Sequence, residues 1–323
     1  MPPALVEHPS NYFYGGLVAC ADDRREGEAP PAGFPWPGGL PLAFVDVRAE
    51  ETKRASGGVT NTREAELVAR HDVRRGEWER GEVRGVRLAD GRTLHSDLVV
   101  SNADAAWTYR HLIKAEHRKR WTDRKIDRSH FSNGLFVWYF GTEGKYPDVP
   151  HHSVILGPRY KGLLDDIFKR KVLADDFSLY LHRPTETDPS LAPEGCDTFY
   201  ALAPVPHLDA DVDWPTYAET FKERICQRLE ETMLPGLRDR IVTSRLLTPQ
   251  DFHDRLNSVK GAAFGYEPRI TQSAWFRPHN RSEDIKGLYL VGAGTHPGAG
   301  MPAVISSAKV IDQLIPEAVI QRA

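Results

Sequence analysis

The sequence predicts an α/β fold, and the last strand, loop and helix carry most of that prediction. Residues 288–291 are apolar and β-prone, a pattern typical of a short strand buried on both faces. Four glycines follow within residues 292–300, and Pro302 then stands at the first turn of a helix expected over residues 303–315. Because a helix N-terminus leaves N–H groups unpaired, we expect an electron-rich or anionic ligand at this loop.

The glycine loop differs from a dinucleotide-binding fingerprint. Its spacing, Gly292-x-Gly294-x-x-x-Gly298, is one residue longer than G-x-G-x-x-G. Asp312 lies at about the distance where that fingerprint places an acidic residue, but it falls inside the expected helix. Since the sequence ends at Ala323, we expect no second strand of a βαβ unit and a cofactor held mainly elsewhere. A glycine-rich connection to a packing helix is the alternative.

Composition indicates a globular protein with enough residues for one large domain or two. Of its 323 residues 40% are hydrophobic, and the net charge of −3 gives no indication of a nucleic-acid partner. Cys20, Cys196 and Cys226 lack metal-ligand spacing, which favours free thiols in a reducing compartment. The sequence has no run of about eighteen apolar residues, so if the substrate is lipid-soluble we expect the protein to reach it from the membrane surface.

The middle of the chain predicts a largely antiparallel sheet with helices. The expected strands are residues 83–88, 93–96, 97–100, 134–140, 153–156, 177–181, 198–203 and 240–247. The expected helices are residues 105–128, 160–171, 214–233 and 249–256. Asp90-Gly91 is a hairpin-turn signal between the first two strands. The helices at 105–128 and 160–171 carry basic residues beside apolar ones, so each is a candidate membrane-surface element, with an ordinary packed or solvated helix as the alternative.

Several motifs occur in one order along the chain. They are Ser101-Asn102-Ala103-Asp104, Gly157-Pro158-Arg159-Tyr160, and the segments 176–182, 190–195, 202–208, 271–280 and 288–308. With them the sequence resembles the C-terminal part of bacterial-type phytoene desaturases, FAD-dependent carotenoid desaturases of the amine-oxidase-like flavoprotein group. The resemblance covers residues 81–316 with few gaps. It implies an α/β fold, with a partial Rossmann-like FAD-binding domain and an inserted α+β substrate domain.

The resemblance also implies domain boundaries. Residues 82–103 and 266–323 would form the partial FAD-binding domain, and residues 104–265 the substrate domain. Residues 1–80 are expected to be an irregular, degraded segment, because prolines and mixed charges interrupt any lasting periodicity. The N-terminal G-x-G-x-x-G of the family is absent from the sequence, so we expect a truncated or frame-disrupted gene product. Sequencing the locus tests this hypothesis, which fails if no upstream frame encodes a glycine fingerprint.

FAD, implied by the resemblance, would supply the hydride acceptor that no side chain provides. The residues implied to contact it are Gly292, Ala293, Gly294, Thr295, Met301, Pro302, Ala303 and Val304. A helix N-terminus near the flavin would stabilise negative charge on the reduced ring. Related amine oxidases often carry a carboxylate where Thr295 stands, which implies a weaker ribityl contact here. Trp275 and Phe276 are implied to line a polyene channel, with core packing beside the last strand as the alternative.

The catalytic acid or base is unknown from the sequence. His296 is the candidate that matches the desaturase pattern, and a loop histidine bonded to its own turn is an equally frequent arrangement. We expect no metal site, because His151 and His152 are adjacent and would point to opposite sides of a strand. No Ser/His/Asp order or supported carboxylate pair indicates another kind of catalysis.

Function follows from the resemblance. It implies FAD-dependent dehydrogenation of phytoene, a hydrophobic C40 polyene, towards lycopene. The alternatives are a non-catalytic C-terminal fragment of such an enzyme, or another flavin-dependent polyene enzyme such as a hydroxycarotenoid desaturase or a carotenoid isomerase. We expect a cytoplasmic protein, peripheral on the inner membrane face. The oligomeric state, the terminal electron acceptor and the number of desaturation steps are not predicted.

Overall fold

The computed structural model describes residues 43–45, 52–53, 59–60, 73–79, 81–88 and 91–315. The remainder of the segment predicted as irregular, Cys20, Asp90 of the predicted turn, and the end of the chain after residue 315 lie outside the described residues. All statements of structure below concern the described part.

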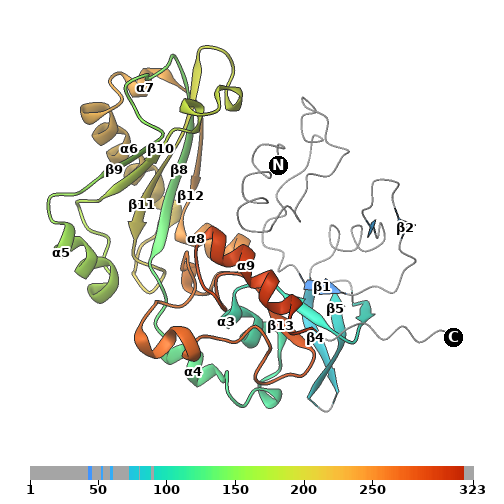
Figure 1. Cartoon of the computed structure of the whole chain (residues 1–323). Helices are drawn as coiled ribbons and strands as arrows, with labels where there is room; N and C mark the ends of the chain where they lie inside the picture. Colours follow the sequence, from blue (N-terminus) through green and yellow to red (C-terminus); the bar gives the residue numbers. More distant parts are fainter. Residues whose placement is uncertain are drawn as a thin grey trace. The chain divides into compact units, whose positions relative to one another are not determined.

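The last strand of the chain belongs to a three-stranded sheet. Its order is β1-β7-β13, formed by Ala43–Val45, Val99–Ser101 and Leu288–Leu290. β7 and β13 run parallel although many residues separate them in sequence, whereas β1 is antiparallel to β7. All three residues of β13 are buried, as the apolar run predicts. The helix α9, Met301–Asp312, follows through the glycine loop (Figure 1).

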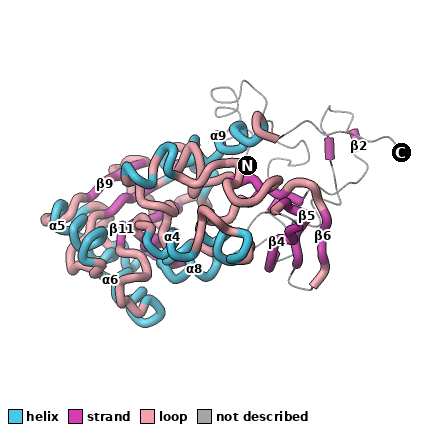
Figure 2. The backbone as a smooth tube through the Cα atoms, turned by 90° about the horizontal axis from the view of Figure 1, so that it is seen from below, coloured by secondary structure: helices cyan, strands magenta, loops and turns pink. Residues whose placement is uncertain are grey.

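A second sheet is antiparallel and consists of β4 (Val73–Glu79), β5 (Glu82–Leu88) and β6 (Thr93–His95) (Figure 2). The prediction of an irregular segment over residues 1–80 is therefore wrong for β4, and also for β1, β2 (Thr52–Lys53) and β3 (Val59–Thr60). Local composition misleads here because cross-strand pairing decides strand formation. The turn into β5 ends at Gly81, whose φ of +79° suits a tight hairpin.

The helix predicted over residues 105–128 is broken into short pieces. They are α3 (Ala105–Trp107), a π-helical turn (Thr108–Leu112), a 3₁₀ turn (Ala115–His117) and α4 (Asp123–Arg128). The carboxylate of Asp284 accepts hydrogen bonds from the backbone N–H groups of residues 119, 120 and 121 at 2.7–3.0 Å. Those N–H groups are therefore used by a distant side chain, and a continuous helix cannot form through them.

The largest sheet has five strands in the order β12-β8-β11-β10-β9, and every pairing in it is antiparallel, as predicted. Its strands are β8 (Gly134–Glu143), β9 (His152–Ile155), β10 (Leu179–His182), β11 (Cys196–Val205) and β12 (Ile241–Leu247). Its helices are α5 (Tyr160–Asp165, continued by a π-helical turn), α6 (Trp214–Thr232), α7 (Leu237–Arg240) and α8 (Pro249–Leu256).

The two faces of this sheet differ. On one face Phe136 and Trp138 pack in a buried core with Phe221 and Leu229 of α6, which lies along the sheet (Figure 1). The other face carries side chains that remain partly exposed, in a row defined by the strand register: Tyr139 pairs with Tyr200, Tyr200 with His182, and His182 with His152. We call these four residues the aromatic row. None of the helices in the described residues is both long and apolar enough to cross a membrane.

Candidate functional site

The loop after β13 is tied to both neighbouring elements. The N–H of Val291 donates to the carbonyl of Ser101 at 3.0 Å, which continues the parallel pairing with β7. The N–H of Gly292 donates at 2.9 Å to the hydroxyl of Ser307, a fully buried residue of α9. The loop is therefore anchored at the carboxyl end of two parallel strands, where ligands bind in open α/β sheets.

Two glycines allow the loop to pack directly on the segment that leaves β7. Gly292 has φ +99°, and a β-carbon there would come within 2.7 Å of Oδ1 of Asn102. A β-carbon at Gly294 would come within 2.9 Å of the β-carbon of Ala105. Both contacts are shorter than side chains tolerate without moving. Glycine is thus required at both positions, because the loop packs directly on Asn102 and Ala105.

Arg277 holds the loop from its other side. It is 7% exposed, and its Nη1 donates to the carbonyls of Ala293 at 2.8 Å and Thr295 at 3.5 Å. No carboxylate pairs with it among the described residues, and burial lowers the pKa of its guanidinium. The following residues add further ties: Thr295 donates to the carbonyl of Pro278 at 2.7 Å, and Asn280 donates to the carbonyl of His296 at 2.8 Å.

These contacts fix the direction of the loop peptides. In a trans peptide the C=O and N–H groups point in opposite directions. Because the carbonyls of Ala293 and Thr295 face Arg277, the N–H groups of Gly294 and His296 point away from it. Within the described part of the chain, no residue accepts a hydrogen bond from these two N–H groups.

The N-terminus of α9 adds unpaired donors next to the loop. Its N-cap is Gly300, which has φ +105° and no side chain to accept hydrogen bonds from the first turn. A β-carbon at Gly300 would meet no atom within 4 Å, and the side chain of Met301 is 76% exposed. Loop donors and helix N-terminus therefore suit a ligand that offers carbonyl or anionic oxygens.

The structure places all eight residues predicted to bind the cofactor on this loop and the first turn of α9, but their side chains differ. Thr295 is fully buried and uses its hydroxyl within the protein, so it offers only backbone groups. Met301 and Pro302 are exposed, and Ala303 and Val304 are half-buried. Whether these residues contact a cofactor stays a prediction.

The two predicted channel residues are both at the surface. Trp275 is 70% exposed and Phe276 is 53% exposed, so core packing, the alternative interpretation, does not describe them. The ring of Trp275 meets the ring of His279 edge-on at 4.6 Å, and His279 lies 5.7 Å from His296. This series of rings connects Trp275 to the glycine loop.

Among the described residues, no side chain is hydrogen-bonded to the ring of His296 as a catalytic partner would be. Neither of its ring nitrogens has a hydrogen-bond partner among the described residues, so a histidine bonded to its own turn is not what forms. Burial lowers the pKa of His296, and the nearby His279 and Arg277 lower it further. The lowered pKa favours the neutral form of the ring, and the role of His296 in catalysis stays a prediction.

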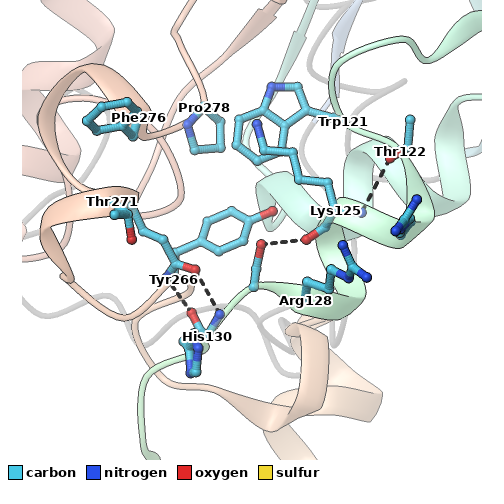
Figure 3. A pocket seen from close by; sticks show the side chains of 12 residues that line it. Trp121, Thr122, Lys125, Arg128, His130, Tyr266, Thr271, Phe276 and Pro278 are labelled. Atoms are coloured by element: carbon cyan, nitrogen blue, oxygen red, sulfur yellow. Dashed lines mark hydrogen bonds between the residues drawn. The ribbon is translucent and has the colours of Figure 1, made fainter.

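A pocket of about 630 Å³ lies where Phe276 and Pro278 face α4 (Figure 3). Tyr266 lines it, and its buried hydroxyl has no hydrogen-bond partner in the described structure. Burial holds the pKa of this phenol well above its usual value. Opposite, Nζ of Lys125 lies 3.5 Å from the ring centroid of Trp121, a cation–π contact. Sequence reasoning missed Tyr266; its one signal is its position just after the glycine-flanked loop 261–265.

Asp104 is a second residue that sequence reasoning passed over as part of a motif. Its carboxylate accepts a hydrogen bond from the N–H of Trp107 at 3.0 Å and caps α3. Burial raises the pKa of Asp104 to about 6, against the lowering effect of backbone hydrogen bonds. Its position beside the glycine loop follows from the packing of Gly294 on Ala105.

The prediction that His151 and His152 point to opposite sides of a strand is wrong. The rings of His151 and His152 lie 4.2 Å apart, although adjacent strand residues point to opposite faces. The alternation does not apply because β9 begins at His152, and His151 lies in the bend before it. Its ring turns toward that of His182 on β10, at 4.7 Å.

The chain belongs to the family of flavin containing amine oxidoreductases, whose sequence model matches residues 53–310. Among similar proteins is a neurosporene-forming phytoene desaturase of Rhodobacter capsulatus, 51% identical over 85% of this chain and 52% of the relative. Another, from Cereibacter sphaeroides, is 56% identical over 74% of this chain and 47% of the relative. A lycopene-forming phytoene desaturase of Pseudescherichia vulneris is 53% identical over 72% and 47%. The resemblance to bacterial phytoene desaturases is thereby confirmed.

Two consequences follow from these similarities. The chain spans about half the length of the curated relatives that it matches. Membership in a flavin-containing family indicates FAD as the cofactor. The glycine loop and the N-terminus of α9 fit this cofactor, because their unpaired N–H groups could donate to its phosphate and carbonyl oxygens.

Proposed function

We propose that this chain belongs to a carotenoid desaturase that dehydrogenates phytoene towards lycopene with FAD. The observation that carries the proposal is the glycine loop of a flavin-containing oxidoreductase, with its donors turned outward, in a chain that is 51–56% identical to phytoene desaturases. When bound, FAD would supply the hydride acceptor that dehydrogenation of a hydrocarbon requires.

The residues of the loop would have distinct tasks in this function. Backbone N–H groups of Gly294 and His296 are directed outward, where they would donate to oxygens of the cofactor. The uncapped N-terminus of α9 would favour negative charge nearby. Arg277 would act as a positioning residue, because it holds the carbonyls on the opposite side of the same peptides.

For the substrate we propose a C40 polyene that contacts the exposed aromatic side chains of Trp275 and Phe276. Large exposed apolar side chains next to a site are a usual mark of a lipid or partner surface. We further propose that the protein is cytoplasmic and peripheral on the inner membrane face. Tyr160 on α5 is 49% exposed, its chain neighbour Lys161 is exposed, and so is Lys169 in the π-helical turn that follows; exposed aromatic and basic side chains suit an anionic membrane surface.

Product analysis tests the proposed activity. The full chain would be incubated with FAD and phytoene in liposomes, and the extracted carotenoids separated by chromatography. We expect FAD-dependent loss of phytoene and appearance of products with longer conjugation, read by their absorbance. Unchanged phytoene, in a preparation that retains FAD, would contradict the substrate assignment. Isomerised phytoene without new double bonds would favour a flavin-dependent isomerase instead.

A further inference from the structure

Three histidines meet at one edge of the five-stranded sheet, away from the glycine loop. One ring nitrogen from each of His151, His152 and His182 lies within 4.8 Å of those of the other two. The closest pair is Nε2 of His151 and Nε2 of His182, which are 2.7 Å apart. His151 and His182 are half-buried and His152 is exposed, so the cluster remains accessible from solvent.

The sheet itself brings two of these rings together. His182 and His152 are directly opposite in the antiparallel pairing of β10 with β9. The N–H of Arg183 donates to the carbonyl of His151 at 2.9 Å, which makes the neighbouring pair the hydrogen-bonded one. His182 and His152 are therefore a non-hydrogen-bonded pair, the type in which side chains approach most closely. Their rings are nearly parallel at 5.2 Å.

Hydrogen bonds orient two of the imidazoles from behind. Nδ1 of His152 lies 2.6 Å from the hydroxyl of Tyr180, and Nδ1 of His151 contacts the hydroxyl of Thr187. Such a bond on one ring nitrogen is the usual way in which a metal-binding histidine is held. In addition, Nδ1 of His182 is buried without any hydrogen-bond partner in the described structure.

Aromatic packing explains only part of this arrangement. The ring of His182 contacts Tyr200 at 4.7 Å within the aromatic row, and stacking alone accounts for that neighbour. Stacking does not account for His151, which lies in the bend before β9 and places its Nε2 against that of His182. Three imidazoles whose nitrogens converge, with outer hydrogen bonds on two of them, have the composition of a metal-binding set.

We propose that His151, His152 and His182 form a binding site for a divalent transition-metal cation of the Zn²⁺ type. Zn–N bonds of 2.0–2.1 Å place tetrahedral ligand atoms about 3.3 Å apart, so the nitrogens need only small ring rotations. No carboxylate belongs to the cluster in the described residues, which disfavours Mg²⁺ and Ca²⁺ because both prefer oxygen ligands. The fourth position would remain open to solvent or a ligand. Because β9 is an edge strand, a bound cation would fasten it to β10.

Calorimetric titration with Zn²⁺ tests the site on the full, tag-free chain after removal of metals by a chelator. We expect one equivalent to bind with micromolar or tighter affinity. The substitution His182→Gln should weaken that affinity by about 100-fold or more, since even an outer partner typically contributes about 10–100-fold. His253→Gln is the matched control, because His253 is exposed on α8 and pairs with Asp254. It should leave the affinity unchanged.

A second variant separates metal binding from a general loss of structure. Tyr180→Phe keeps all three imidazoles and the ring packing but removes the hydroxyl that holds His152. We expect a loss of about 10-fold in Zn²⁺ affinity, with an unchanged melting temperature in the absence of metal. Saturating Zn²⁺ should raise the melting temperature of the wild-type chain and not that of His182→Gln. Absence of stoichiometric binding, or equal affinity in wild type and His182→Gln, would overturn the proposal.

Discussion

The guanidinium of Arg277 lies 2.8 Å from the carbonyl oxygen of Ala293, in the middle of the glycine loop. Arg277 is buried, and its other hydrogen bond to the loop is to the carbonyl of Thr295. A buried cation that is bonded to carbonyls on one side turns the corresponding N–H groups to the other side. The proposed donation of these N–H groups to FAD therefore depends on Arg277, which lies on the opposite side of the loop from the proposed cofactor.

Replacing Arg277 should weaken FAD binding. We expect Arg277→Met to cost about 1.5–3 kcal/mol of FAD binding free energy, the range for charged hydrogen bonds, or about 10–150-fold in Kd. Quenching of flavin fluorescence on binding measures this. Arg228→Met on the exposed side of α6 is the control and should leave the Kd unchanged. An Arg277→Met chain that is folded and binds FAD as tightly as wild type would refute the positioning role.

A side chain at Gly294 should destabilise the fold. A β-carbon there meets the β-carbon of Ala105 at 2.9 Å, so Gly294→Ala forces the loop away from α3. We expect a loss of about 1–3 kcal/mol in the free energy of unfolding, measured by urea denaturation. Ala299→Ser, at an exposed position of the same loop, should change it by less than about 0.5 kcal/mol. Equal stability of the two variants would show that the loop does not pack as described.

The buried ion pair of Arg183 and Asp197 should be the most sensitive polar contact of the large sheet. Nε of Arg183 lies 3.0 Å from Oδ2 of Asp197, and both side chains are almost fully buried. Among the described residues, Asp197→Ala leaves the buried cation with only the exposed Glu186 as a charged partner, so we expect a loss of about 3–5 kcal/mol in the free energy of unfolding. Glu186→Ala should cost less than about 1 kcal/mol. Thermal unfolding of both variants measures the two losses. A larger loss of stability for Glu186→Ala than for Asp197→Ala would contradict this prediction.

Asp104 should make the stability of the chain depend on pH. Its pKa of about 6 in the fold exceeds the ordinary 3.8, so the folded state binds its proton more tightly than the unfolded state. The associated stability is present below pH 4 and is lost as the pH rises through 6. The difference between a pKa of about 6 in the fold and the ordinary 3.8 corresponds to a loss of at most about 3 kcal/mol.

The comparison with Asp104→Asn isolates this effect, because the amide still caps α3 but does not titrate. Unfolding free energies of both proteins would be measured between pH 4 and 7. We expect the wild type to lose stability relative to the variant as the pH rises. A constant difference between the two proteins over that range would show that the carboxyl is not protonated in the fold.

The sequence predicts those parts of the fold whose signals are local. The apolar run before Gly292 and the helix beginning near Pro302 form as expected, because each pattern lies within a few residues. The antiparallel strands β8 to β12 likewise follow from short apolar runs bounded by turns. The resemblance to a family then adds a predicted function for the loop, cofactor binding, which the spacing of its glycines does not indicate.

Contacts between distant residues account for what the sequence does not predict. Asp284 interrupts the expected helix at 105–128, and nothing near residue 119 signals it. Arg277 reaches the carbonyl of Ala293 only after the chain has folded back, and His182 meets His151 through strand pairing. In each case tertiary structure brings together groups whose individual neighbourhoods look ordinary.

Retention of FAD tests the central claim most directly. The purified full chain would be mixed with excess FAD and passed through a gel-filtration column, and the flavin absorbance of the protein peak measured. We expect close to one FAD per chain, and less FAD for Arg277→Met but not for Arg228→Met. A protein peak without flavin, from a chain that is folded by circular dichroism, would contradict the claim that this loop binds FAD.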